Sequence, residues 1–319
     1  MKSSSILITG AFGQIGGELI EALQQRFGPA NVIALDLRTK PAGLNVVAYQ
    51  SDATDSQTVE KIIERHQIKT VYHLASLLSA TGEQQPDLAW QVNANGLKTI
   101  LDLAVKHQLQ LFWPSSIAVF GPTTPKKMVP QRSVLEPTTM YGVTKLAGEQ
   151  LCHYYHLKYG LDVRSLRYPG LISWKTPPGG GTTDYAVDIF HQALQTGRYS
   201  CFLKAETTLP MMYMDDAIRA TIELMSAAPE RLSVRTSYNL AGVSFAPKEL
   251  ASAISQTTPV TVVYKPDFRQ QIADSWPESI DDTVAFHDWA WQPEFDLVAI
   301  VKIMLDNLKV SLAPPTDVK

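Results

Sequence analysis

Three glycines near the start of the chain constrain its fold more than any other feature. The apolar segment 5–9 reads as a short strand, and TGAFGQIG follows it, placing Gly10, Gly13 and Gly16 at GxxGxxG spacing. Glycines at this spacing let a strand turn sharply into a helix, bring the backbone close to an anion and allow tight packing of the helix on the strand. The unpaired N–H groups of the first helical turn then face that anion. The turn therefore predicts a site for a dinucleotide pyrophosphate.

The segment after the turn supports this interpretation, which three glycines alone would carry only weakly. Residues 14–27 have apolar side chains at helical spacing, and a second apolar strand, 32–35, ends at Asp36, twenty residues after Gly16. An acidic side chain at this position accepts both adenosine-ribose hydroxyls and repels a 2′-phosphate, so it favours NAD over NADP. Arg38 is the counter-argument, because its guanidinium could hold that phosphate. We give Asp36 more weight, since it occupies the fingerprint position.

The composition excludes several classes of function. With 319 residues and a formal net charge of −3, the chain can form a main core and a second lobe, and it has no basic footprint for nucleic acid or an acidic membrane. Cys152 and Cys201 have no metal-type spacing, so we expect reduced, buried thiols and no metal. The first residues lead directly into a strand, and no apolar run is long enough to span a bilayer. We expect a small-molecule substrate, no nucleic acid or membrane partner, and a cytoplasmic location.

Strands and helices alternate along the first half of the chain. Strand-like runs at 46–49, 70–74, 109–114 and 163–168 alternate with helical patterns at 55–66, 88–107 and 140–159. Right-handed crossovers then give an α/β fold, a doubly wound parallel Rossmann sheet whose ligands bind beyond the carboxyl ends of the strands. From about residue 169 shorter elements punctuated by Pro and Gly predict a smaller lobe. We expect an NAD-binding domain from 1–168 and about 214–240, and a substrate lobe from about 169–213 and 241–319.

Tyr141 and Lys145 lie four residues apart near the start of a predicted helix, so their side chains project from one face. A tyrosine has an ordinary pKa of about 10, and lowering that pKa to neutrality costs about 4 kcal/mol. A nearby ammonium and the positive nicotinamide both favour the phenolate. An amphipathic helix can carry this pair by chance, but the dinucleotide turn upstream favours a reactive base.

Other polar residues follow the predicted strands. Ser115 and Ser116 end a strand at the ligand-binding edge, so either is a candidate to hold a substrate oxygen, although serines after a proline also simply turn a chain. Asp52 is expected to hold the adenine amine or to cap a helix, and His73 to lie in the core. Asn93 is expected to have a backbone or packing role beside the cofactor. The residues expected to line the cofactor are Gly10, Gly13, Gln14, Ile15, Gly16, Asp36, Leu37, Arg38, Asp52, Ala53, Leu74, Ala75, Ser76, Asn93, Tyr141, Lys145 and Tyr168.

Four motifs together resemble the extended short-chain dehydrogenase/reductase superfamily across essentially the whole chain. They are TGxxGxxG, the paired serines, YxxxK and the phrase YMDDAIRA. The resemblance implies a catalytic set of Ser116, Tyr141 and Lys145, with Ser115 as neighbour or substitute.

Longer phrases are similar to the branch of that superfamily that oxidises L-threonine with NAD to 2-amino-3-oxobutanoate. They include HLASLLSATGE, FWPSSIAVFG, PPGGGTTDYAVDIF and FRQQIADSWPESIDD. The resemblance implies that Tyr141, as phenolate, takes the hydroxyl proton while a hydride leaves the β-carbon. Lys145 would lower the tyrosine pKa and bind the ribose, and Ser116 would fix the substrate oxygen.

Residues 177–184 are expected to form a lid that closes over the substrate, because two prolines and three glycines precede a Thr-Thr-Asp run. Thr182, Thr183 and Asp184 are therefore candidates to hold the zwitterion. Ser79 and Trp276 are weaker candidates, for which an ordinary loop serine and a core aromatic are at least as probable.

Two other classes of function compete with this interpretation. Nucleotide-sugar epimerases and dehydratases of the superfamily place an Asn where this chain has Gly170, and an Arg where it has Leu209 and Pro210. Both departures remove groups that hold a diphosphate. A non-catalytic NAD-binding regulator would be expected to have a damaged YxxxK motif, which is intact here.

The helices predicted at 88–107 and 140–159 carry apolar residues on more than the one face that would pack against the sheet. In the resembling superfamily such helices pair across a two-fold axis, which implies a homodimer through a four-helix bundle. The apolar residues that led to this expectation include Ile100, Leu101, Leu103, Leu146, Leu151 and Tyr155.

Overall fold

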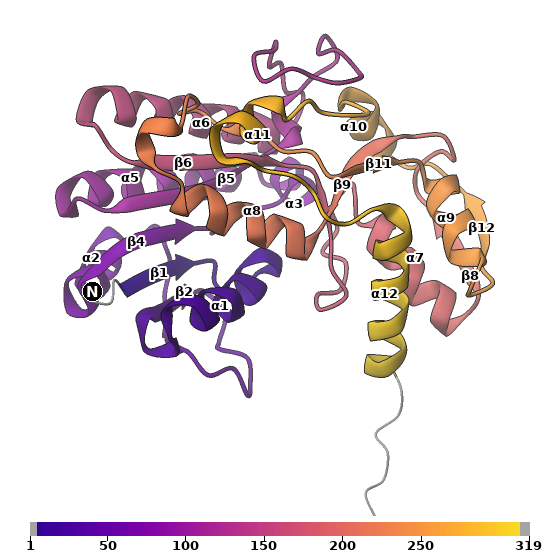
Figure 1. The fold of residues 1–319 in the computed structure, drawn as a ribbon, viewed down its shortest axis with the longest axis horizontal. Helices are drawn as coiled ribbons and strands as arrows, with labels where there is room; N and C mark the ends of the chain where they lie inside the picture. The colour runs from indigo at the N-terminus through magenta and orange to yellow at the C-terminus, as the bar shows by residue number, and fades with distance from the viewer. Residues whose placement is uncertain (1–4, 313–319) are drawn as a thin grey trace, which may run out of the picture.

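A parallel β-sheet forms the core of one half of the protein in a computed structural model that describes residues 5–312 (Figure 1). Within those residues the main sheet has seven strands in the order β10-β6-β5-β4-β1-β2-β3, and its strand pairs are parallel. This is the predicted Rossmann topology. The strands are β1 (Ser5–Thr9), β2 (Val32–Asp36), β3 (Val47–Gln50), β4 (Ile68–His73), β5 (Gln110–Ser116), β6 (Val163–Tyr168) and β10 (Tyr238–Asn239).

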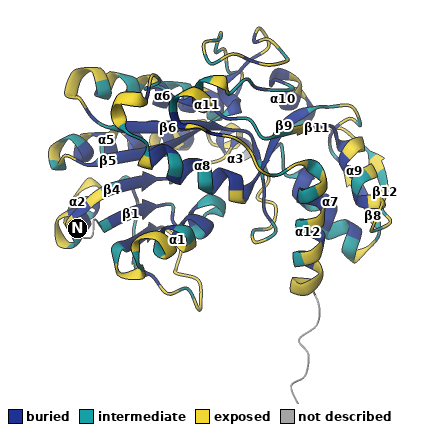
Figure 2. Cartoon of the chain, in the orientation of Figure 1, coloured by how far each residue is buried: buried dark blue, intermediate teal, exposed yellow. Residues whose placement is uncertain are grey.

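Helices cover both faces of this sheet, because alternate strand residues point to opposite sides and both sides are apolar. On β1, Ile6 and Ile8 pack toward α1 (Gln14–Phe27) and α8 (Met214–Ser226). Leu7 packs toward α2 (Ser56–His66), α5 (Gly96–His107) and α6 (Met140–Tyr159). Figure 2 shows the result as a dark, buried sheet beneath helices whose outer faces are exposed.

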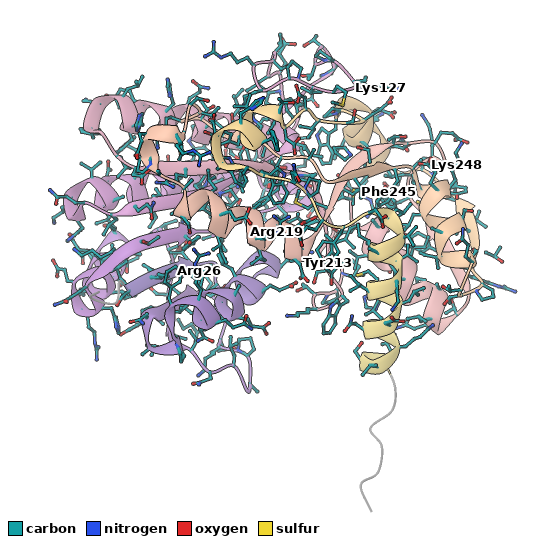
Figure 3. All side chains as sticks on the ribbon, viewed as in Figure 1. Arg26, Lys127, Tyr213, Arg219, Phe245 and Lys248 are labelled. Atoms are coloured by element: carbon teal, nitrogen blue, oxygen red, sulfur yellow. The ribbon has the colours of Figure 1, made fainter. Side chains whose placement is uncertain are left out.

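A second apolar core forms the other half of the molecule. It surrounds a three-stranded sheet, β11-β9-β7, and a strand pair, β12-β8, within the described residues. Tyr213 ends β9 near the middle of the molecule and packs its ring 4.9 Å from that of Phe295 (Figure 3). The remaining elements of this half are β7 (Gly170–Ile172), α7 (Tyr185–Gln195), β8 (Arg198–Cys201), β9 (Leu209–Tyr213), β11 (Val243–Phe245), α9 (Pro247–Ser255), β12 (Thr261–Tyr264), α10 (Arg269–Ser275) and α12 (Leu297–Leu312). The helix α11 (Thr283–Trp289) instead packs on the core of the main sheet.

One predicted helix is broken in the structure. The segment expected as one helix over 88–107 consists of α4 (Pro86–Trp90), a π-helical turn at Gln91–Asn95 and α5, and a short helix, α3 (Ser79–Gln84), precedes it. The π turn contains the buried Asn93, whose side chain hydrogen-bonds outside its own helix. The spacing of apolar residues could not predict this π turn, because the residue buried in it, Asn93, is polar.

The apolar residues that led to the expectation of a dimer are mostly buried within the chain itself, so they offer little exposed surface for a contact between subunits. Ile100, Leu101, Leu103 and Tyr155 belong to the core beneath α5 and α6, and Leu151 is only partly buried against it. The exposed apolar residues of this region lie on neighbouring positions, including Trp90 and Val143. Both cysteines are buried free thiols, and none of the helices over residues 5–312 is long and apolar enough to cross a membrane.

Candidate active site

The glycine turn at the end of β1 has the geometry that a dinucleotide phosphate requires. Gly10 has a φ of +65°, and a Cβ at that position would lie 2.6 Å from the backbone nitrogen of Ala75. Gly13 is the N-cap of α1, where no side chain caps the helix and no acidic residue lies in its first turn. Donors with no capping side chain, on a positive helix end, fit an anion. The residues present therefore fit the pyrophosphate of NAD.

Asp36 lies at the tip of β2, beside this turn. Its carboxylate accepts hydrogen bonds from the backbone of Phe12 (2.9 Å) and of Arg38 (2.9 Å), and from the Arg38 guanidinium (3.1 Å). Burial alone would raise the pKa of Asp36, but these hydrogen bonds hold it below its usual value. Arg38 is therefore paired with Asp36 in this structure, and both residues lie where an adenosine ribose would be recognised.

The end of β4 forms the next part of the site. Leu74 donates its backbone N–H to Thr9 at 2.9 Å, which keeps Leu74 to Ser76 next to the glycine turn. The Asn93 side chain accepts from Leu77 N and donates to the Thr144 hydroxyl, so it joins this loop to α6. His73 lies in the core as expected, with its Nδ1 bonded to the Thr9 hydroxyl at 2.7 Å, and burial lowers its pKa to about 3. Asp52 accepts from Thr54 N, and the side-chain cap of α2 is Asp55.

Tyr141 and Lys145 lie in the first turns of α6, whose N-cap Thr139 accepts from Gly142 N. The Lys145 amine is buried, donates to the carbonyl of Pro114 at 2.8 Å, and lies 5.4 Å from the centre of the Tyr141 ring. Burial lowers the pKa of Lys145 to about 7. Burial also raises the pKa of Tyr141 to about 12, against a hydrogen bond with the Ser116 side chain that lowers it. Burial is therefore the largest influence on the pKa of both side chains.

The two serines at the end of β5 have different surroundings. Ser116 interacts with Tyr141, and its Oγ also accepts from Ala118 N at 3.2 Å. Ser115 is buried, and its hydroxyl donates to Glu149 Oε1 at 2.7 Å. Ser116, at the end of the strand, therefore lies next to Tyr141, whereas the Ser115 hydroxyl is taken up by Glu149 on the same helix.

The segment 177–184 folds around Asp184. One oxygen of the Asp184 carboxylate, Oδ2, accepts hydrogen bonds from the backbone N–H groups of Gly179, Gly180 and Gly181 at 2.7–2.8 Å, so Asp184 organises the loop. Thr182 is buried with an Oγ1 that has no hydrogen-bond partner among the described residues. A buried hydroxyl with no partner fits a ligand contact.

Gly170 distinguishes this site from the sites of nucleotide-sugar enzymes, which have an asparagine at this position. A Cβ at Gly170 would lie 2.5 Å from the sulfur of Met211 and 2.6 Å from Cγ2 of Thr183. An asparagine at this position would require both neighbours to move. The packing around Gly170 is therefore adapted to the absence of a side chain.

Two residues predicted to line the site have side chains that pack in the core. The Tyr168 hydroxyl bonds to Thr221 and its ring packs near Phe112, so only its main chain remains for a cofactor. Trp276 is buried in the core of the second half. Ser79 is also buried, in the first turn of α3.

Glu149 and Arg167 were missed by the sequence analysis. The carboxylate accepts from Arg167 Nη2 at 2.7 Å, and both side chains are buried. A signal was present, because Glu149 follows Tyr141 and Lys145 at four-residue steps on one helix.

Comparison with known proteins agrees with this geometry. The sequence profile described as "NAD dependent epimerase/dehydratase family" matches residues 6–241. The chain is 47% identical to the L-threonine 3-dehydrogenase, mitochondrial, of Bos taurus over 94% of this chain and 82% of that protein. It is similar to the solved GalE-like L-threonine dehydrogenase from Cupriavidus necator in its holo form, with a TM-score of 0.94, 54% identity and coverage of 95% and 99%. A monomeric L-threonine 3-dehydrogenase from a metagenome database matches with a TM-score of 0.94, 50% identity and coverage of 96% and 99%.

Proposed function

The chain belongs to the NAD-dependent epimerase/dehydratase family and is an oxidoreductase whose cofactor is NAD, and from that premise we propose that it oxidises L-threonine to 2-amino-3-oxobutanoate. The observation that carries the proposal is the convergence of three side chains at the edge of the sheet: Ser116 ends β5 beside Tyr141, and the buried Lys145 amine lies 5.4 Å from the Tyr141 ring. NAD supplies the hydride acceptor when bound. Similarity to the bovine and Cupriavidus enzymes supports threonine as the substrate.

Each side chain then has a defined task in this proposal. Tyr141 takes the proton of the substrate hydroxyl, and Ser116 holds the same oxygen. The Lys145 amine lies between the Pro114 carbonyl and the tyrosine ring, where its charge favours the phenolate. The reaction releases one proton and transfers one hydride to NAD for each ketone formed. Glycine at position 170 argues against a diphosphate-linked sugar as the substrate.

A substrate screen tests the proposal directly. L-threonine, D-threonine, L-serine and UDP-sugars are each incubated with NAD, and reduced nicotinamide is followed by its absorbance. We expect rapid reduction with L-threonine and none with UDP-sugars. Conversion of a UDP-sugar without net reduction, and no reduction with L-threonine, would assign the chain to the epimerase class.

We expect the 177–184 segment to act as a lid over the substrate. Thr182→Ala should then raise KM for L-threonine about tenfold, because one buried hydrogen bond to the substrate is lost. KM for NAD should stay unchanged. Gly180→Pro should lower kcat, since Gly180 has a φ of +94° and donates its N–H to Asp184. Gly179→Ala is the matched control, because its φ is not positive and its nearest neighbour to an added Cβ is 3.9 Å away. Steady-state constants equal to the unmodified values in both variants would rule out the lid.

We further propose a homodimer through α4, α5 and α6. A groove with a volume of about 450 Å³ lies between these helices, lined by Trp90, Ala94, Ala147 and Leu151 among others. Light scattering at micromolar concentration is expected to give the dimer mass, and Trp90→Glu the monomer mass. Phe286→Glu, an exposed aromatic on α11, should leave the dimer intact. One similar protein is described as monomeric. A monomeric mass of the unmodified chain would therefore contradict the proposed dimer.

The cellular location also remains a proposal. We propose a cytoplasmic enzyme, whereas the bovine relative is described as mitochondrial. Fractionation of the source cells, with the protein followed by antibody, would distinguish the two.

A further inference from the structure

A buried ion pair between Glu149 and Arg167 contacts Ser115, the residue next to the candidate catalytic Ser116. Glu149, on α6, is fully buried, and its two oxygens accept from Arg167 on β6 at 2.9 and 2.7 Å. Neither charge faces solvent, so each depends on the other for its stability. Such a pair cannot shift without leaving a charge unpaired.

Ser115 connects this ion pair to the edge of β5. Its hydroxyl donates to the Glu149 oxygen that also accepts from Arg167 Nε. In the sheet register Ser115 lies opposite Arg167, and Ser116 opposite Tyr168. The next residue along the strand, Ser116, is the one whose side chain lies next to Tyr141. The hydrogen bond of Ser115 therefore fixes the backbone from which the Ser116 hydroxyl projects.

The other end of the ion pair is anchored as well. Arg167 Nη1 donates to Asn239 Oδ1 at 3.0 Å and to the carbonyl of Gln131 at 3.2 Å. Asn239 in turn donates to the carbonyls of Val129 and Asp281. The network thus joins β5, β6 and β10 to α6, the helix that carries Tyr141 and Lys145.

We propose that Ser115 and Glu149 are positioning residues, which hold the Ser116 hydroxyl at the Tyr141 phenol through the Glu149–Arg167 pair. This inference rests on the proposed function, and it assigns Ser115 a task that differs from contact with substrate. Its consequence is electrostatic as well as geometric. The Ser116 hydrogen bond lowers the pKa of Tyr141, so a displaced Ser116 leaves that pKa higher.

The test compares two buried serines on adjacent strands. Ser115→Ala removes the bond to Glu149, whereas Ser165→Ala removes a bond to the Ser237 hydroxyl and leaves the hydrogen bonds of Glu149 and Arg167 in place. We expect Ser115→Ala to lower kcat about tenfold, to keep KM for L-threonine and NAD within about twofold, and to move the acidic limb of the kcat–pH profile upward. Ser165→Ala should change none of these. Ser115→Thr, which retains the hydroxyl, should restore most of the lost kcat.

Two results would overturn the inference. One is a wild-type kcat and pH profile in Ser115→Ala. The other is a loss as large as that of Ser116→Ala with a raised KM for L-threonine, which would place Ser115 in contact with substrate. Crystal structures of the Ser115→Ala and Ser165→Ala variants provide a readout that needs no substrate: the Ser116 Oγ should be displaced from Tyr141 in the first and not in the second. If the unmodified enzyme fails to oxidise L-threonine, the proposed function is wrong, and this displacement still decides the inference.

Discussion

Replacing Tyr141 by phenylalanine is expected to lower kcat about 10³-fold while NAD still binds, because the variant keeps the ring and loses the proton acceptor. The loss should appear in kcat, since the hydroxyl acts on the reacting oxygen. Steady-state kinetics with L-threonine and titration of NAD by calorimetry measure the two parts. Tyr154→Phe is the matched control, because Tyr154 lies on the same helix with its hydroxyl bonded to the exposed Lys158.

The pH dependence gives the same assignment a second test. Burial raises the pKa of Tyr141 to about 12, so the phenol is protonated at neutral pH and the fraction of phenolate grows as pH rises. We therefore expect kcat to rise with pH through the neutral range. Lys145→Met should move this rise to higher pH, because the nearby positive charge is lost. A purified, folded Tyr141→Phe protein with near-normal kcat would exclude Tyr141 as the base.

The second large effect concerns the choice of cofactor. The unmodified enzyme is expected to prefer NAD to NADP by about 10³-fold in kcat/KM, and Asp36→Ala to reduce this preference by about 10²-fold, since two charge-assisted hydrogen bonds to the ribose are lost. Removal of Asp36 also frees the Arg38 guanidinium, which Asp36 holds in the structure. The freed guanidinium can then pair with the 2′-phosphate.

Two further variants separate these contributions. Asp36→Ala combined with Arg38→Ala should lose the gain in NADP use that Asp36→Ala alone produces. Asp52→Ala should leave the preference unchanged, because the exposed Asp52 bonds only to its own turn. Equal use of NAD and NADP by the unmodified enzyme would show that Arg38, not Asp36, governs the pocket.

Local sequence patterns were sufficient to predict most of the fold. The strands β1 and β6 and the helices α1 and α6 have the predicted bounds, because glycine turns and apolar periodicity act over a few residues. The placement of Tyr141 and Lys145 on one helix face, and of the paired serines at one strand end, also followed from such patterns, whereas the choice of Ser116 came from the resemblance to the superfamily.

Features that depend on distant polar partners were not predictable in this way. Asp184 has a backbone-binding role because three N–H groups converge on it, and Tyr168 faces Thr221, a residue far along the chain. Ser115 and Ser116 are identical in type and adjacent in sequence, and only the buried Glu149 distinguishes them. The sequence carries no local mark of which buried side chains will meet.

The carboxylate of Asp184 has an energetic consequence for a substrate as small as an amino acid. Small ligands supply at most about 1.5 kcal/mol of binding free energy per non-hydrogen atom, and ordering one backbone residue costs about 1–2 kcal/mol. If Gly179, Gly180 and Gly181 had to become ordered during binding, they would consume much of what such a ligand can supply. Asp184 already holds all three, so the loop is able to move as one preassembled piece. The conformational entropy of its glycines is therefore lost when the chain folds and not when the substrate binds. The binding free energy of the substrate can then contribute to its affinity and its orientation.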